Sequence, residues 1–455
     1  MLKAKNVDIL NGDLLKNIII YSVPIMLVGL IQNLFHSVDL MVLRVVASDN
    51  EVAAVGAPTQ IISLLVNTFF GISGGVKIVL ARFLGAKEEQ AIKKTVSTAI
   101  VSAFVIGVLV AIVGVSLSPT FLRLTKCPDE CFDGALTYMR IFVAAAPATL
   151  MYNFGSAIIN TTGDSQRPLY YMIASGLLNI TLNFALCMII PQKVAAVAIA
   201  TVASNMLGAI LVVRRLCKLD GICRLDLRKL SWNRKAFGRI FVNGAPIAIS
   251  SALFPLANLQ IQTAINSYGT VAIAGNSAAI SLETMISPIA TSAWSASCTV
   301  FVGQNLGAKN NERVKKSIKY HIILALFCGL VLGITAFSFS RHLLSLFVAS
   351  KDAIAYGRIR TMYILLPYAV GSVYSVLSHI IQGFGYAICS SATSIVCVFG
   401  FRIFWMNFIY PIYPSFSTLM QCFIVSWLLM LAVYTVIFLY LYFAKFKKGT
   451  LKKII

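Results

Sequence analysis

Residues 84–94 read LGAKEEQAIKK and residues 306–316 read LGAKNNERVKK, so the same stretch returns after 222 positions. Other residues keep a similar register, with shifts of 219 to 222: Pro24 with Pro246, Gly56 with Gly275, Pro147 with Pro367, and Gly163 with Gly383. One chance motif would not keep this register over the rest of the chain. The sequence therefore predicts two related halves.

The composition is that of an integral membrane protein. Hydrophobic residues make up 58% of the 455 positions, and the mean hydropathy is +0.83. Charged residues make up only 12%, against about 25% in soluble domains. Apolar stretches of about 20 residues or more, which suffice to cross a bilayer, cover residues 16–43, 52–81, 95–117, 135–160, 168–190, 194–216, 238–264, 271–303, 318–340, 357–382, 387–411 and 416–444. The expected fold class is an all-α membrane protein with twelve transmembrane helices in two six-helix lobes.

The distribution of Lys and Arg predicts a multi-pass protein of the cell membrane with both termini in the cytoplasm, because short basic loops resist translocation. The expected domains are an N-lobe of residues 1–217 with spans 1–6, a cytoplasmic basic linker of residues 218–238, and a C-lobe of residues 239–455 with spans 7–12. Six spans in each half place both halves in the same orientation. This predicts a parallel repeat about a pseudo-two-fold axis along the membrane normal.

The net charge of +22 follows from this topology, and anionic lipid headgroups are the expected neighbours of the basic loops. No nucleic-acid-binding module accompanies these loops, so nucleic acid is not an expected partner. The sequence has no GxxxxGK[ST] motif and no HExxH pair, and we expect neither an enzyme nor a cofactor. Most of the ten cysteines lie in apolar runs, but Cys127 and Cys131 lie four apart in the outer loop CPDEC and could pair or share a metal. The alternative is that they are two free thiols of the loop. We expect a monomer.

Only Asp39 and Glu283, of sixteen acidic residues, fall inside the predicted spans. A charge in hydrocarbon is costly, so such a residue normally faces a cavity and is used. Asp39 shares one helical face with Gln32 and His36 at spacing i, i+4, i+7, which predicts a hydrated interior beside the first span. The alternative is that Asp39 is solvated at the outer end of its helix.

A cation site is predicted around Asp39. Asp39, Asn183 and Thr201 lie at a similar depth, roughly 6 to 10 Å below the outer ends of their spans, and Asn179 lies one turn from Asn183 on the same face. Carboxylate, amide and hydroxyl oxygens suit a hard cation such as Na+, and a carboxylate alone suits H+. For Asn179, Asn183 and Thr201 the alternative role is hydrogen bonding between helices.

The second half contains two deep charges, Glu283 and Arg402, about 18 and 14 Å from the outer ends of their spans. We expect them to face each other, either as a structural ion pair or as part of a substrate site, because a deep arginine needs an acceptor. Span 7 adds a polar stripe that includes Asn258 and Gln262. The predicted substrate cavity comprises Gln32, His36, Asn258, Gln262, Glu283 and Arg402.

Pro24 and Pro246 occupy matching positions inside spans 1 and 7. A proline inside a helix frees a backbone carbonyl and permits a bend. We therefore predict hinges at these two residues, with a static kink as the alternative.

Several segments resemble the multidrug and toxic compound extrusion (MATE) transporters, and the resemblance covers essentially the whole chain. They are the first span around Pro24 and Asp39, AAVGAP at Ala53–Pro58, LLNITLN at Leu177–Asn183, IATVASN at Ile199–Asn205 and FVGQNLGAK at Phe301–Lys309. The resemblance implies two lobes that open alternately to either side of the membrane. It also implies export of organic cations by antiport with Na+ or H+.

The resemblance would place a cation site at Asp39, Asn179, Asn183 and Thr201. Many similar members have an aspartate where this chain has Asn183, so a single carboxylate remains here. The acid that some relatives carry in span 7 is also missing, with Phe254 near the equivalent place. Glu283 is then the only acid available for the C-lobe.

The expected function is a secondary active antiporter that exports amphipathic, cationic organic compounds and is driven by a H+ or Na+ gradient. Small organic molecules and membrane lipids are the expected partners. A flippase for lipids or lipid-linked oligosaccharides, from the same superfamily, is the main alternative. It would favour a cavity lined by many Arg or Lys residues, and the predicted spans contain few. A channel or receptor would show no coupled ion flux.

Overall fold

The computed structural model describes residues 6–46, 48–125, 127–219, 221–449 and 451, and for residues 35–46 and 49 it describes the backbone alone. The described chain is helical and contains no strand. It divides into two compact units. Unit 1 comprises Met1–Val7 and Leu27–Gly244, and unit 2 comprises Asp8–Met26 and Ala245–Ile455.

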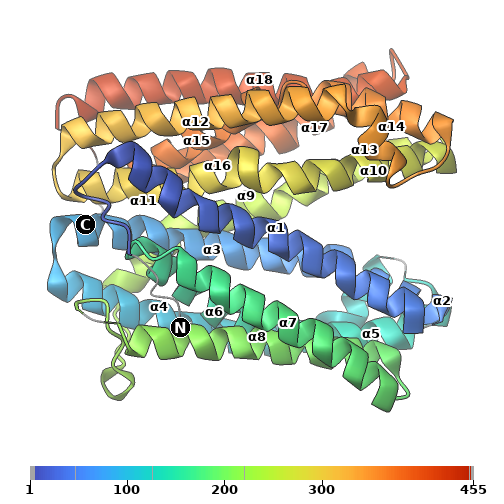
Figure 1. Ribbon diagram of the computed structural model, residues 1–455, viewed down its shortest axis with the longest axis horizontal. Helices are drawn as coiled ribbons and strands as arrows, with labels where there is room; N and C mark the ends of the chain where they lie inside the picture. The colour runs from blue at the N-terminus through green and yellow to red at the C-terminus, as the bar shows by residue number, and fades with distance from the viewer. Residues whose placement is uncertain (1–5, 47, 126, 220, 450, 452–455) are drawn as a thin grey trace. The chain divides into compact units, whose positions relative to one another are not determined.

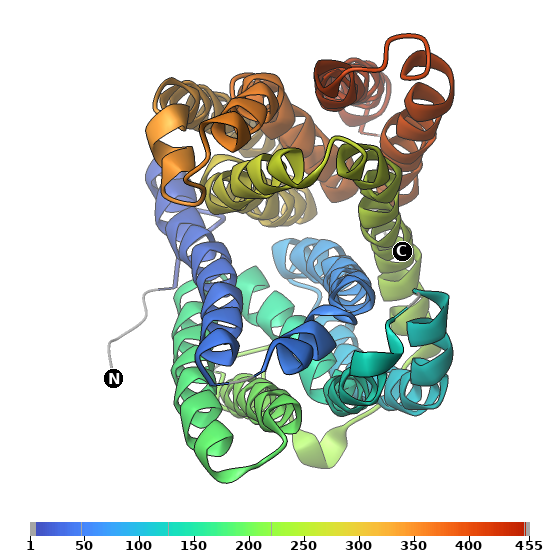
Figure 2. The ribbon, with the colours of Figure 1, turned by 90° about the vertical axis from the view of Figure 1, so that its right-hand side faces the viewer.

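Two long helices belong to both units: α1 (Leu14–Val46) and α9 (Arg234–Asn266). The other helices of unit 1 are α2 (Asp49–Gly56), α3 (Thr59–Ala86), α4 (Glu89–Leu124), α5 (Asp129–Ala144), α6 (Ala146–Thr161), α7 (Gln166–Ile189), α8 (Lys193–Cys217) and the short 3-10 helix η1 (Leu227–Lys229). Figure 1 labels most of these helices, and Figure 2 shows many of them nearly end-on.

The α-helices of unit 2 are α10 (Thr270–Ser287), α11 (Ala293–Gly307), α12 (Asn311–Ser338), α13 (Ser340–Ser345), α14 (Lys351–Ile364), α15 (Tyr368–Gly383), α16 (Ala387–Ser394), α17 (Phe401–Phe404) and α18 (Phe416–Tyr440). Four π-helical stretches extend or join them: η2 (Pro288–Ser292), η3 (Ile395–Gly400), η4 (Trp405–Ile409) and η5 (Leu441–Phe446).

The helices account for the membrane spans expected from the sequence. Among the described residues, ten helical stretches are long and apolar enough to cross a membrane, or twelve when each of two bent helix pairs counts as one span. The bent pairs are α5 with α6, at 44°, and α14 with α15, at 45°. They occupy the fourth place in each half. The structure thus confirms an all-α membrane fold with six spans in each half.

The repeated LGAK stretch forms the same turn in both units. Lys87 and Lys309, with φ of 55° and 57°, are the only non-glycine residues with positive φ among those described. Each follows a helix, and its N–H donates to the carbonyl of Leu84 or Leu306 three residues earlier. This left-handed residue ends α3 and α11 and directs the chain into the next helix.

A second repeated turn corrects one detail of the sequence register. Gly163, with φ of 90°, connects α6 to α7, and its conformational counterpart is Gly385, with φ of 87°. Their separation is 222 residues, whereas the sequence comparison aligned Gly163 with Gly383. Gly383 lies inside α15 and does not have positive φ. Only the backbone conformation distinguishes these two nearby glycines.

Within each unit, equivalent helices make equivalent packing contacts (Figure 1). In unit 1, α6 packs against α3, α4 and α8, and in unit 2, α15 packs against α11, α12 and α18. Glycine permits the closest approach at equivalent positions. A Cβ atom on Gly107 would lie 2.4 Å from the Cα of Pro147, and one on Gly329 would lie 2.8 Å from the Cα of Ala369. Each unit therefore depends on the same backbone contact between its third and fourth spans.

The helices α1 and α9 are shared reciprocally between the units. The start of α1 belongs to unit 2, where the ring of Tyr21 lies 5.5 Å from that of Phe301 on α11. The start of α9 belongs to unit 1, where a Cβ on Gly75 of α3 would lie 2.3 Å from the carbonyl oxygen of Ile240. The first helix of each repeat thus begins in the other repeat's unit.

We expect Gly107→Ala to lower the free energy of unfolding by about 1–3 kcal/mol, because the added methyl group would overlap the α6 backbone. Gly238→Ala is the matched control, since Gly238 is also helical but a Cβ atom added there would have no other atom within 4 Å. The measurement is unfolding of the purified protein in mixed micelles. Equal stability of the two variants would contradict the close helix contact.

Candidate functional site

Three of the predicted cation-site residues meet inside unit 1, and we call Asn179, Asn183 and Thr201 the amide cluster. Asn183 is fully buried and Asn179 is 6% exposed. The Nδ2 of Asn183 donates to Oδ1 of Asn179 over 3.2 Å, and the Nδ2 of Asn179 donates to Oγ1 of Thr201 over 3.4 Å. Since the two asparagines are four residues apart on α7, they share a face, and Thr201 faces them from α8.

The amide cluster offers two kinds of chemistry. Its amide and hydroxyl oxygens are hard ligands of the kind that Na+ accepts. Its hydrogen bonds also join α7 to α8, as polar side chains do between membrane helices. All three residues are uncharged, so charge-driven ion binding needs a carboxylate in addition.

The predicted residues on α1 are described only in part. His36 and Asp39 belong to the helix, but their side chains lie outside the described residues. Gln32 is described and is exposed. The proximity of Asp39 to the amide cluster therefore stays a prediction.

Unit 2 contains a charged network around Glu283. The carboxylate Oε2 of Glu283 on α10 lies 2.8 Å from Nη2 of Arg360 on α14. The side chain of Glu283 is 24% exposed and that of Arg360 only 8%. Nη1 of Arg360 also donates to Oδ1 of Asn276 over 3.0 Å. The amide of Asn276 then donates to Oε1 of Gln262 on α9, over 3.4 Å.

Arg402 on α17 is a second buried arginine in unit 2, at 1% exposure. Its Nη1 donates to Oδ1 of Asn258 on α9. Its guanidinium carbon lies 4.4 Å from the ring centre of Phe423 and 5.2 Å from that of Phe254. These are the distances of cation–π contacts. Phe254 thus contacts Arg402 through its ring.

The ion-pair partner of Glu283 is Arg360 and not Arg402, in contrast to the expectation from the sequence. The reason is that α14 places Arg360 directly opposite Glu283, whereas α17 points Arg402 toward Asn258. Arg360 was missed because it lies near the start of a span. The sequence feature that could have identified Arg360 is its helical spacing from the other buried residues of α14. The buried residues are Ala353, Gly357, Arg360, Thr361 and Ile364.

The unit 2 network carries more positive than negative charge. Two guanidinium groups share the ring of Phe423, since Arg360 lies 5.0 Å from the same ring centre, and one carboxylate accompanies them. Within the described part of the chain, Nε and Nη2 of Arg402 have no hydrogen-bond partner. Of the three charged residues in this network, Glu283 has the largest exposed fraction.

The prolines predicted as hinges lie where α1 and α9 change units. Pro24 precedes the change between Met26 and Leu27, and Pro246 follows the change between Gly244 and Ala245. Each proline removes one backbone hydrogen bond from its helix. The bend that it permits would act close to the point where the helix passes from one unit to the other.

Cys127 and Cys131 are free thiols whose sulfur atoms lie 3.8 Å apart. The described residues contain no group of three or more His, Cys, Asp or Glu side chains that could hold a metal ion.

The comparison with protein families decides the identity of the fold. The MatE family model matches the chain twice, over residues 24–185 and 246–407, again with an offset of 222 residues. The chain belongs to the MatE family. The protein "Probable multidrug resistance protein YoeA" of Bacillus subtilis is 26% identical over 391 residues, which cover 84% of each chain. A "FAD transporter" of Shewanella oneidensis is 24% identical over 330 residues, covering 70% of this chain and 71% of its own.

The MatE assignment agrees with the solved structures. A structure described as "Crystal structure of MATE in the bent conformation" superposes with a TM-score of 0.87 at 21% identity, covering 98% of this chain and 99% of its own. This likeness confirms the fold. It extends over nearly the whole length of both chains.

We expect Glu283 and Arg360 to be energetically coupled, with a coupling free energy on the order of 1–3 kcal/mol in a double-mutant cycle. Glu283→Gln should destabilise the protein more than Arg360→Gln, because loss of the acid leaves two buried guanidinium groups without a carboxylate. The cycle is measured by unfolding in mixed micelles. The control pair is Glu312 with Lys315, which is exposed and should show almost no coupling. Equal coupling in the two pairs would contradict this account.

Proposed function

We propose that this protein is a secondary active antiporter that exports amphipathic organic compounds across the cell membrane and has both termini in the cytoplasm. The observation that carries the proposal is the double match to the MatE family, which covers both halves of the chain. The relative from Bacillus subtilis is described as a multidrug resistance protein, which supports a small-molecule substrate. The driving gradient in this proposal is H+ or Na+.

We propose Asp39 as the coupling residue, with the amide cluster supplying neutral oxygen ligands. The support is the burial of Asn179 and Asn183 and the chain of hydrogen bonds that joins them to Thr201. A cation or proton at Asp39 would neutralise the carboxylate, alter helix packing in unit 1 and favour release of the substrate outside. For this exchange to work, the ion must prefer one conformation over the other, because equal affinity for both would shift neither population.

The substrate class follows from the charges in unit 2. An organic cation is the first candidate, and Glu283 is the carboxylate that solvent reaches in the unit 2 network. An acidic compound is the second candidate, because Arg360 and Arg402 outnumber Glu283. A relative described as a FAD transporter fits this second candidate. A lipid flippase is less favoured, since it would need a cavity lined by many more cations.

We also propose Pro24 and Pro246 as hinges. Alternating access requires parts of the protein to move as bodies, and hinges lie at a few residues that absorb the change. Both prolines lie within α1 or α9, close to the residues where the helix passes between units.

A Na+ gradient and a H+ gradient are imposed separately on vesicles that contain the protein, and we expect one of them to drive efflux of an amphipathic cationic dye. The substitution Asp39→Asn should abolish this efflux. Loss of the carboxylate removes the charge for which ion and substrate compete. Asp129→Asn is the control, because Asp129 is an exposed acid at the start of α5 and should leave efflux unchanged. Running the same assay with FAD as cargo separates the two substrate classes. Undiminished ion-driven efflux by Asp39→Asn would overturn the coupling proposal.

Pro246→Ala should reduce the maximal rate of efflux severalfold without a comparable loss of stability, because the substitution restores a backbone hydrogen bond and stiffens α9. Dye efflux rate and thermal unfolding are measured on the same preparation. Pro119→Ala on α4 is the control, since Pro119 also lies inside a helix but well within unit 1. An unchanged rate for Pro246→Ala would mean that the proline is only a static kink.

A further inference from the structure

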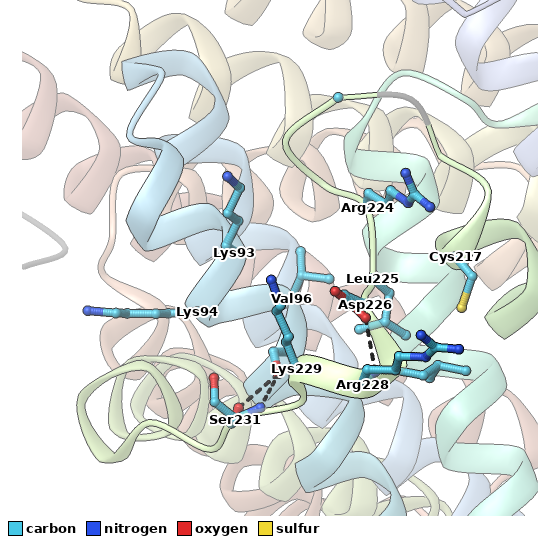
Figure 3. A pocket seen from close by; sticks show the side chains of 13 residues that line it. Lys93, Lys94, Val96, Cys217, Arg224, Leu225, Asp226, Arg228, Lys229 and Ser231 are labelled. Atoms are coloured by element: carbon cyan, nitrogen blue, oxygen red, sulfur yellow. Dashed lines mark hydrogen bonds between the residues drawn. The ribbon is translucent and has the colours of Figure 1, made fainter.

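A strongly basic hollow lies in unit 1 between the start of α4, the end of α8 and the segment that precedes α9 (Figure 3). Its volume is about 840 Å³. The described charged residues that line it are Lys93, Lys94, Arg224, Arg228, Lys229 and a single acid, Asp226. We call this feature the linker hollow. Asp220, beside the lining residue Gly221, lies outside the described residues.

The wall of the linker hollow is held by an alternating pattern of side chains. Cys223 and Leu225 are buried at 5% and 3% exposure, while their neighbours Arg224 and Asp226 are exposed. The N–H of Leu225 donates to the carbonyl of Leu216, over 3.0 Å, at the end of α8. Burial of alternate apolar residues thus turns the charged ones outward, into the hollow.

The C-terminal end of the same segment is hydrogen-bonded to α4. The N–H of Ser231 donates to Oγ of Ser97 over 2.7 Å, and the N–H of Asn233 donates to Oγ1 of Thr98 over 3.1 Å. Dashed lines in Figure 3 mark hydrogen bonds at Ser231. The linker hollow therefore has walls fixed by hydrogen bonds at both ends of the linker.

The cations of the linker hollow are not neutralised within the described part of the chain. None of the ion pairs found there includes Lys93, Lys94, Arg224, Arg228 or Lys229. Asp226 instead accepts the backbone N–H of Arg228, over 3.0 Å, at the start of η1. Five like charges around one space repel each other and favour an anionic ligand.

The helix α12 of unit 2 corresponds to α4, and one of its matching lysines belongs to an ion pair. Lys93 and Lys94 correspond to Lys315 and Lys316 on α12, and Lys315 pairs with Glu312 over 2.6 Å. Next to α12 lies the segment before α1, which carries Asp8 and is bound by Arg313 through the carbonyls of residues 9, 11 and 12.

The acid of that segment stays ionised. Partial burial by itself would raise the pKa of Asp8, but hydrogen bonds from Asn11 and Leu10 and the nearby charge of Arg313 hold this pKa below its ordinary value.

We propose that the linker hollow binds the phosphate-bearing headgroup of an anionic phospholipid. Exposed apolar side chains continue from the hollow along the linker, with Leu227, Leu230 and Trp232 at 55%, 42% and 52% exposure. Tryptophan and leucine beside Lys and Arg are typical of segments that meet the membrane interface. The cations would hold the phosphate and the apolar side chains would contact the acyl chains. This proposal is independent of the transport direction, coupling ion and substrate.

The test is native mass spectrometry of the full-length protein in neutral detergent, titrated with dioleoylphosphatidylglycerol or dioleoylphosphatidylcholine. We expect tighter binding of phosphatidylglycerol. The triple variant Lys93→Gln/Arg224→Gln/Arg228→Gln should bind it at least about tenfold more weakly, because each Lys or Arg near an anionic surface contributes roughly fivefold. Unchanged thermal unfolding without lipid shows that this variant is folded, since all three side chains are exposed.

The matched control is Lys315→Gln/Lys316→Gln/Lys319→Gln on α12, which removes the same number of charges at the equivalent helix. It should retain the affinity of the unaltered protein. Equal loss in both triple variants would show attraction to net charge and overturn the proposal. Glycerol 3-phosphate serves as a headgroup without acyl chains. If it binds as tightly as phosphatidylglycerol, the hollow is a site for a soluble phosphate compound and the lipid assignment is overturned.

Discussion

A charged or polar side chain among apolar helices is stable only when it has a partner, and this constraint organises both polar regions of the protein. In unit 2 it joins Glu283 to Arg360 and directs Arg402 toward Asn258 and the ring of Phe423. In unit 1 it joins the neutral side chains of the amide cluster into a chain of hydrogen bonds. Each region is therefore a place where polar side chains join neighbouring helices.

The two halves share a backbone and differ in chemistry. The turns at Lys87 and Lys309 and the close contacts at Gly107 and Gly329 recur at the same offset, because they depend on backbone geometry. The polar regions do not recur. Among the described side chains, unit 1 has buried amides on α7, whereas unit 2 has an acid and two arginines on α10, α14 and α17. Similar arrangements of helices thus support a neutral cluster in one unit and a charged network in the other.

The reciprocal sharing of α1 and α9 gives the fold a mechanical consequence. The first helix of each repeat begins in the unit built mainly by the other repeat, and Pro24 and Pro246 lie near the residues of change. A bend at either proline would therefore act on a helix that has contacts in both units. The sequence indicated the prolines, but the sharing of helices follows only from contacts such as those of Tyr21 with Phe301.

The sequence by itself determined the number of spans, their helical nature, the repeat and the family, because hydrophobic length and recurring turn motifs are properties of local segments. It also predicted that Asp39, Asn183 and Thr201 lie at a similar depth, since depth follows from the rise of a helix. Only the tertiary structure decided that Glu283 pairs with Arg360 instead of Arg402, and that the linker forms a basic hollow beside α4. The physical reason is that the rotation of each helix about its axis determines which side chains meet. This rotation depends on packing against several distant segments at once.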